Sequence, residues 1–210
     1  MGEYELLSKI KSPHDVKKLN DEQLEKLCTE IREKLVETVS VNGGHLSPNL
    51  GVVELTVALE RSFNLPKDSI VWDVGHQAYT HKLLTGRYEQ FDTIRKKGGI
   101  SGFPKRAESK YDDFNTGHSS TSISAAYGIA RAKHLMGDQS YTVAVIGDGS
   151  LSGGEALEGL DFASELNSNL IIVVNDNDMS IAENHGGLYK NLKQLRDTDG
   201  KSECNLFKSM

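Results

Sequence analysis

Two apolar runs on either side of one helical segment limit, more strongly than any other feature, how this chain can fold. Residues 141–146 form the first run, residues 169–174 form the second, and residues 153–166 between them have the pattern of one helix. This order predicts a parallel strand–helix–strand unit. In such a unit the turns after both strands lie at the carboxyl edge of the sheet, where open α/β folds bind their ligands.

A polar turn follows each of these predicted strands. The first is the tight turn Gly147-Asp148-Gly149, and the second is Asn175-Asp176-Asn177. Because both turns lie at one edge of the sheet, we expect Asp148 and Asn177 to approach each other although 29 positions separate them. A carboxylate and an amide oxygen beside a glycine turn and a helix start suit a hard cation that holds a phosphorylated ligand.

Two other interpretations of these turns stay open. Gly147, Gly149 and Gly153 resemble a loosened dinucleotide fingerprint, with Asp176 or Asp178 in place of the acid that binds the ribose. In the simplest interpretation, both segments are only turns. The negative charge of Asp148 favours a metal site. Asp148 would repel a pyrophosphate placed directly against it, whereas a divalent ion between the two turns that repulsion into attraction.

Further helices and one strand precede this unit. A helix is predicted from Asn20 or Asp21 to the residue before Asn42, because apolar residues recur at three- and four-residue steps. Residues 45–49 are expected to form a loop, since Pro48 disfavours helix at the residue before it. The other expected elements are a helix at about 51–63, a buried strand at 70–74, a helix from 121 to about 135, a loop at 180–187 and a polar tail of weak periodicity to residue 210.

The alternation of helices and strands predicts an α/β fold, doubly wound, with a mainly parallel sheet flanked by helices. A chain of 210 residues fits a single domain with a sizeable core. Residues 205–210 look like a helix without a cap or a breaker. We therefore expect residues 1–210 to form one domain that is a fragment of a longer protein.

The charge balance narrows the class of partner. A formal net charge of −6 disfavours nucleic acid and anionic membranes, so a phosphate must be held by a metal ion, main-chain N–H groups or a few side chains. Neither Cys28 nor Cys204 has the partner pattern of a disulfide framework or a zinc site. The sequence shows no signal peptide and no apolar stretch that could span a bilayer, and we expect the protein to be cytoplasmic.

Three histidines directly follow a glycine, namely His45, His76 and His118. A glycine before a histidine permits a close approach of the main chain at a loop tip. His76 comes just after a predicted strand, so it should share the carboxyl edge with Asp148. Such histidines offer proton transfer near pH 7, or donors for phosphate oxygens, without a fixed charge. The remaining histidines are interpreted as structural: His14, His81, His134 and His185.

The stretch from Gly117 to Ser122 places hydroxyl groups at the start of a predicted helix. We expect Ser119 or Ser120 to cap this helix through its side chain. The exposed N–H groups of the same helix start are also expected to cradle an anion.

Several longer strings carry a resemblance to a known family. The turns at 147–149 and 175–177, with a segment of this length between them, resemble the thiamine diphosphate-binding motif. The strings that look more narrowly like the 1-deoxy-D-xylulose-5-phosphate synthase family are residues 44–47 (GHLS), 72–79 (WDVGHQAY), 117–124 (GHSSTSIS) and 175–181 (NDNDMSI). Transketolase shares the general plan but not these strings.

The resemblance implies a set of site residues. The ligands of Mg²⁺ would be Asp148, the Asn177 side chain and the Met179 carbonyl. The residues at the thiamine diphosphate would be Gly149, Ser150 and Asn177 on its diphosphate, together with His76, Gly117, His118 and Ser119. The catalytic residues would be His45 and His76, which would face the reacting carbon and assist proton transfers.

The resemblance also implies a reaction. Family members condense pyruvate with D-glyceraldehyde 3-phosphate, release CO₂ and form 1-deoxy-D-xylulose 5-phosphate for isoprenoid, thiamine and pyridoxal biosynthesis, with the cofactor as electron sink. They are far longer, and the domain that binds the cofactor pyrimidine would lie beyond this fragment. We therefore expect the chain alone to turn over little or nothing, and the full-length protein to be a homodimer.

Two alternative functions stay open. The chain could be the N-terminal half of a split transketolase, which would use sugar phosphates as donors. It could also be a nucleotide-binding module without catalytic activity.

Overall fold

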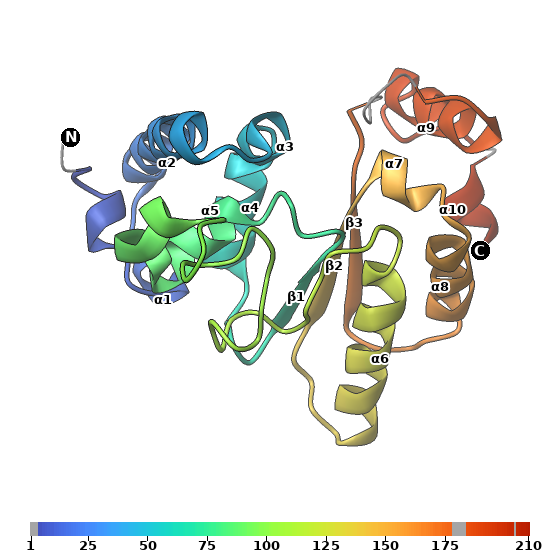
Figure 1. The fold of residues 1–210 in the computed structure, drawn as a ribbon. Coiled ribbons are helices and arrows are strands. Elements are labelled where there is room, and N and C mark those ends of the chain that lie inside the picture. Colours follow the sequence, from blue (N-terminus) through green and yellow to red (C-terminus); the bar gives the residue numbers. More distant parts are fainter. Residues whose placement is uncertain (1–3, 178–183, 204) are drawn as a thin grey trace.

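A parallel sheet lies at the centre of the computed structural model, which describes residues 4–177, 184–203 and 205–210 (Figure 1). Its strands, in spatial order, are β1 (Ser69–Trp72), β2 (Thr142–Gly147) and β3 (Leu170–Asn175). Both pairings are parallel, and Gly147 of β2 lies opposite Asn175 of β3. The predicted strand–helix–strand unit is confirmed, and the three strands end at one edge of the sheet.

Helices surround this sheet. Their bounds are α1 (Pro13–Val16), α2 (Asp21–Asn42), α3 (Leu46–Leu50), α4 (Val53–Ser62), α5 (Tyr79–Lys82), α6 (Ser122–Leu135), α7 (Asp148–Leu151), α8 (Gly154–Ser164), α9 (Gly187–Asp197) and α10 (Leu206–Ser209), with short helical turns η1 (Leu7–Lys9), η2 (Leu83–Arg87) and η3 (Tyr88–Thr93). In the part of the chain that the structure describes, none of them has both the length and the apolar character needed to cross a membrane.

Both faces of the sheet are covered, as a doubly wound α/β fold requires (Figure 1). On one face, buried side chains of the strands, among them Val71 and Ala144, pack against α6 and α8. On the other face, Trp72 and Val145 pack with Leu59 of α4. Successive strand residues point to opposite faces, so strands that are covered on both sides have the continuous apolar runs seen in the sequence. The predicted fold class is confirmed.

The N-terminal helices form a second apolar cluster beside the sheet. The helix α2 begins where the sequence predicts and ends one residue later than predicted, at Asn42, and Asn20 and Gln23 exchange side-chain-to-main-chain hydrogen bonds of 2.9 and 3.0 Å across its first turn. Its buried face packs on α4 and α5 in a cluster that includes Ile31, Val57 and Tyr79. This cluster supports the loops that leave β1 and α2.

One predicted loop is helical. Residues 45–49 were expected to form a loop, but Leu46–Leu50 is the helix α3. Pro48 lies in its first turn, where a main-chain N–H has no helical partner in any case, so the proline removes no hydrogen bond. In the polar tail, α10 lies within the helix-like stretch predicted at 205–210, and α9 is a helix that the weak periodicity did not predict. The predicted loop at 180–187 lies partly outside the described residues.

The turn after β2 also differs from the prediction. The helix predicted at 153–166 is α8, but in place of a tight turn before it Asp148 begins the short helix α7, and a break at Gly153 separates α7 from α8. The break has a packing reason. The Ser120 hydroxyl donates a hydrogen bond of 2.7 Å to the Ser150 carbonyl, and a Cβ at Gly153 would lie 1.9 Å from that hydroxyl oxygen. Only glycine leaves room for Ser120 there.

Candidate active site

The structure brings two of the three glycine-flanked histidines together. The ring centroids of His45 and His76 are 5.1 Å apart, and the rings meet edge to face at 73°. His45 precedes α3 and is exposed, whereas His76 follows the carboxyl end of β1 and is partly buried. His118 is exposed and makes no ring contact with either of them in the described structure.

The environment of His76 keeps its imidazole neutral near pH 7. Burial lowers the pKa of His76, and repulsion from a charged His45 lowers that pKa further, while Asp73 opposes the shift. Its Nδ1 atom is buried and has no hydrogen-bond partner among the described protein groups. A buried ring nitrogen without a protein partner is available for a hydrogen bond to a bound molecule.

His76 is delivered by a strained turn at the end of β1. Val74 has a φ of +57°, which is a genuine outlier for a β-branched residue, and Gly75 has a φ of +83°. The Gly75 N–H reaches back to the Asp73 carbonyl at 2.5 Å. Strain of this kind persists only where surrounding contacts hold the turn, and such outliers cluster at functional sites.

The Asp73 carboxylate is one of these contacts, and the sequence pattern did not reveal it. Asp73 is 1% exposed, and its two oxygens accept hydrogen bonds of 2.9 Å each from the N–H groups of Ser120 and Ser122 at the start of α6. The prediction that Ser119 or Ser120 caps α6 is wrong: the cap position is Thr121, which makes no side-chain capping bond. The sequence signal that could have revealed the role of Asp73 is an acid directly after a buried strand.

This contact also limits the predicted anion cradle. Two N–H groups at the start of α6 already bind the internal carboxylate of Asp73, so they are not open to a ligand. The residues before them, Gly117, His118 and Ser119, are exposed. Asp73 therefore ties the turn that carries His76 to the loop at 117–119.

Replacing Gly75 by alanine is expected to destabilise the protein by about 2–4 kcal/mol. An added Cβ would lie 2.1 Å from Thr116 Oγ1 and 2.5 Å from Pro104 Cδ, in addition to the cost of a positive φ. Urea unfolding checks this value. Gly137→Ala is the matched control, because Gly137 has a φ of +73° with nothing within 4 Å of the added Cβ. Equal losses in both variants would contradict the packing argument.

Asp148 lies at the carboxyl end of β2, beside the end of β3. It is 3% exposed, and its Oδ2 accepts a hydrogen bond of 2.7 Å from Asn184. Burial raises the pKa of the Asp148 carboxyl, and the charge of Asp176 raises it further, against hydrogen bonds that include those from Gly149 N–H and Asn184. A buried carboxylate with a second acid nearby is a position where a cation gains free energy.

The other residues predicted to bind Mg²⁺ or the diphosphate lie at the same edge of the sheet or outside the described residues. Gly149 and Ser150 belong to α7, and Asn177 follows β3 and is exposed. Met179 lies outside the described residues. The described residues contain no group of three or more His, Cys, Asp or Glu side chains that could hold a metal. The predicted Mg²⁺ ligands include only one carboxylate, so they would not form such a group of side chains.

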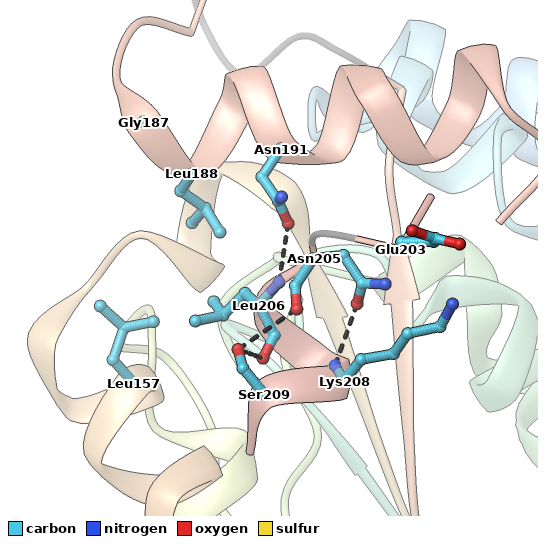
Figure 2. Close-up of a pocket in the computed structure, with 9 residues that line it drawn as sticks. All are labelled: Leu157, Gly187, Leu188, Asn191, Glu203, Asn205, Leu206, Lys208 and Ser209. Carbon is cyan, nitrogen blue, oxygen red and sulfur yellow. Dashed lines mark hydrogen bonds between the residues drawn. The ribbon is translucent and has the colours of Figure 1, made fainter. Parts of the chain in front are cut away.

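A cavity of about 770 Å³ lies apart from this edge, between α8, α9 and α10 (Figure 2). Leu157, Leu188 and Leu206 face it, and the Leu206 N–H donates a hydrogen bond of 3.1 Å to the Asn191 side chain. None of the predicted site residues that the structure describes lines this cavity. The candidate site is therefore the carboxyl edge of the sheet, where His76, Asp148 and Asn177 follow adjacent strands.

Comparison with known proteins identifies the family of this chain. A family described as 1-deoxy-D-xylulose-5-phosphate synthase matches residues 7–207. The synthase of Carboxydothermus hydrogenoformans is 58% identical over 93% of this chain and 31% of its own length. Synthase 1 of Geobacter metallireducens is 59% identical over 87% of the chain and 29% of its own length. The chain thus spans about 30% of these relatives.

Solved structures show the same fold. A transketolase variant from Pichia stipitis has a TM-score of 0.70 at 25% identity, over 75% of this chain and 27% of its own. The transketolase of Campylobacter jejuni has a TM-score of 0.71 at 18% identity, over 88% of this chain and 36% of its own, which shows the fold alone. The family match and the identities decide the assignment: the chain belongs to the 1-deoxy-D-xylulose-5-phosphate synthase family.

Proposed function

We propose that this chain is the part of a 1-deoxy-D-xylulose-5-phosphate synthase that binds the diphosphate and Mg²⁺ of thiamine diphosphate. The full-length protein then condenses pyruvate with D-glyceraldehyde 3-phosphate, with loss of CO₂, in isoprenoid precursor biosynthesis. One observation carries the proposal: the ends of three adjacent parallel strands bring His76, Asp148 and Asn177 to one edge of the sheet. Open α/β sheets bind ligands at this edge.

The donor groups fit the metal. Asp148 supplies a buried carboxylate, Asn177 an exposed amide, and the Met179 carbonyl is the third ligand by resemblance. Mg²⁺ binds few protein oxygens and completes its coordination with phosphate and water. The cation also offsets the burial of the Asp148 charge and its repulsion by Asp176.

The same edge of the sheet would hold the diphosphate. Gly149 and Ser150 follow Asp148 in the first turn of α7, and the exposed loop at 117–119 would supply further contacts. The net charge of −6 gives the protein no broad basic surface for a phosphate, so the metal carries most of the charge compensation.

The two paired histidines act on the substrate side. His76 is neutral near pH 7 and has a ring nitrogen without a protein partner, so it can accept a proton or donate one to a reacting oxygen. His45 is exposed and stands at 5.1 Å from it, so it can exchange protons with the solvent. When bound, thiamine diphosphate supplies the electron sink for breaking and forming carbon–carbon bonds.

The remaining parts of the active site come from outside this chain. We propose that the rest of the full-length homodimer supplies the glutamate that activates the aminopyrimidine and the basic residues for the substrate phosphate. The chain alone should therefore bind the cofactor but turn over little or nothing. Pyruvate-dependent CO₂ release by the full-length protein distinguishes this function from that of a split transketolase.

Calorimetry of this chain with thiamine diphosphate tests the proposal. We expect binding in the presence of Mg²⁺, and little binding when EDTA removes the metal, because the diphosphate charge is then uncompensated. NADH is the comparison ligand. Binding of NADH but not of thiamine diphosphate would refute the proposal in favour of a nucleotide-binding module.

A further inference from the structure

One buried asparagine connects the two histidines through their main chains. The Asn49 side chain of α3 is fully buried, and its amide nitrogen donates hydrogen bonds of 2.6 Å to the His45 carbonyl and 2.8 Å to the His76 carbonyl. Its amide oxygen accepts a hydrogen bond of 2.9 Å from Tyr79 N–H. We propose that Asn49 is a positioning residue that holds His45 and His76 as a pair.

No other side chain of similar size meets these three requirements. An amide has two N–H donors and a carbonyl acceptor, and Asn49 uses both donors and the acceptor. Aspartate lacks the donors, and it would place a negative oxygen beside two carbonyl oxygens. Leucine fills a similar volume, but it would leave the two carbonyls and the Tyr79 N–H unpaired in a buried environment.

The two histidine segments need such a connection because neither is held by regular structure. His45 stands at the cap position of α3 and makes no side-chain capping bond. His76 follows the strained turn at Val74 and Gly75, whose preceding residue Asp73 is bound to the start of α6. Asn49 binds the main chain of His76 itself, so we expect the ring geometry of the pair to depend on it.

NMR of the histidine rings tests this inference without cofactor or turnover. In the wild-type chain we expect a nuclear Overhauser effect between the His45 and His76 rings. In Asn49→Ala the two loops separate, the effect disappears, and the pKa of His76 rises toward its ordinary value as burial and the His45 charge weaken. Persistence of the effect and of the lowered pKa would overturn the inference.

The matched control is Asn42→Ala. Asn42 also uses its amide nitrogen to bind two main-chain carbonyls, those of Asp92 and Ile94 at 3.0 and 3.2 Å, but it lies at the end of α2. Its loss removes similar hydrogen bonds and should leave the ring contact unchanged. Disappearance of the ring contact in this control too would overturn the assignment to Asn49.

A second measurement covers the case in which Asn49→Ala does not fold. In the wild-type chain, the two amide hydrogens of Asn49 should exchange with water far more slowly than those of the exposed Asn115. Equal exchange rates would overturn the inference.

The relevance of the pair to turnover rests on the proposed function and has a separate test. In the full-length protein, Asn49→Ala should lower kcat by about 100-fold with little change in KM for pyruvate, because misplacement by about 1 Å has effects of this size. Loss of the ring contact without loss of kcat would refute the catalytic role of the histidines and leave the positioning role of Asn49 intact.

Discussion

Replacing Asp148 by alanine is expected to weaken Mg²⁺-dependent binding of thiamine diphosphate by about 100-fold or more, while the protein stays folded. Asp148 supplies the only charge in the proposed ligand set, and even residues behind metal ligands commonly change metal affinity by about 10–100-fold. The fold should survive because α7 tolerates alanine, and because the charge of Asp148 is already disfavoured by burial and by Asp176. Calorimetry with and without Mg²⁺ measures the loss.

The control for this experiment is Asp161→Ala. Asp161 lies exposed on α8, so the variant changes the net charge by the same amount without touching the edge of the sheet. It should bind the cofactor like the wild-type chain. If Asp148→Ala keeps the wild-type affinity in Mg²⁺, the metal assignment is wrong, and the glycine turn after β2 is only a structural feature.

Most of the sheet and one long helix were predictable from local patterns. The strands β1 and β2 have continuous apolar runs because both of their faces are buried, and the helix α2 has a capping pair at Asn20 and Gln23 with regular apolar spacing. The common edge of the strands follows from the rule for parallel connections. The register then places Gly147 opposite Asn175.

The remaining features depend on contacts between distant residues. The helix α7 has four residues, which is too short to show a helical period. The pattern at 117–122 predicted a hydroxyl cap, but the carboxylate of Asp73, which lies 47 positions before Ser120, binds the N–H groups instead. A carboxylate oxygen is a stronger hydrogen-bond acceptor than a hydroxyl. The whole sheet determines whether the Asp73 carboxylate reaches the start of α6. The role of Asn49 could not be predicted from the sequence for the same reason.

His81 shows how little a local pattern says about a buried charge. The sequence predicts only a structural role for it, and the structure places it fully buried between two carboxylates. Its Nδ1 is 2.5 Å from Glu60, and its Nε2 is 3.1 Å from Asp112. Arg87 completes the cluster through hydrogen bonds of 2.6 and 2.8 Å to Asp112. Glu108 lies 3.7 Å from Arg87 and pairs with Lys82 at 2.7 Å, so three positive and three negative groups balance when His81 carries its proton.

This balance makes the stability of the protein depend on pH. Burial alone lowers the pKa of His81, but the attraction of Glu60 and the hydrogen bonds to Asp112 and Glu60 outweigh it and raise that pKa to about 9. The folded protein thus holds this proton more tightly than the unfolded chain, whose ordinary value is 6.5. The stabilisation is complete below pH 6.5 and is lost as the pH rises through about 9; its size is about 3 kcal/mol.

Replacing His81 by glutamine is expected to destabilise the protein by about 3–5 kcal/mol near pH 6.5, because two buried carboxylates then share one cation. The loss should shrink toward pH 9, where the wild-type histidine has itself released much of its proton. Urea unfolding at both pH values measures the two effects. His134→Gln, at an exposed position on α6, should change neither. If the wild-type and His81→Gln chains lose the same stability between pH 6.5 and 9, His81 is not the group that titrates.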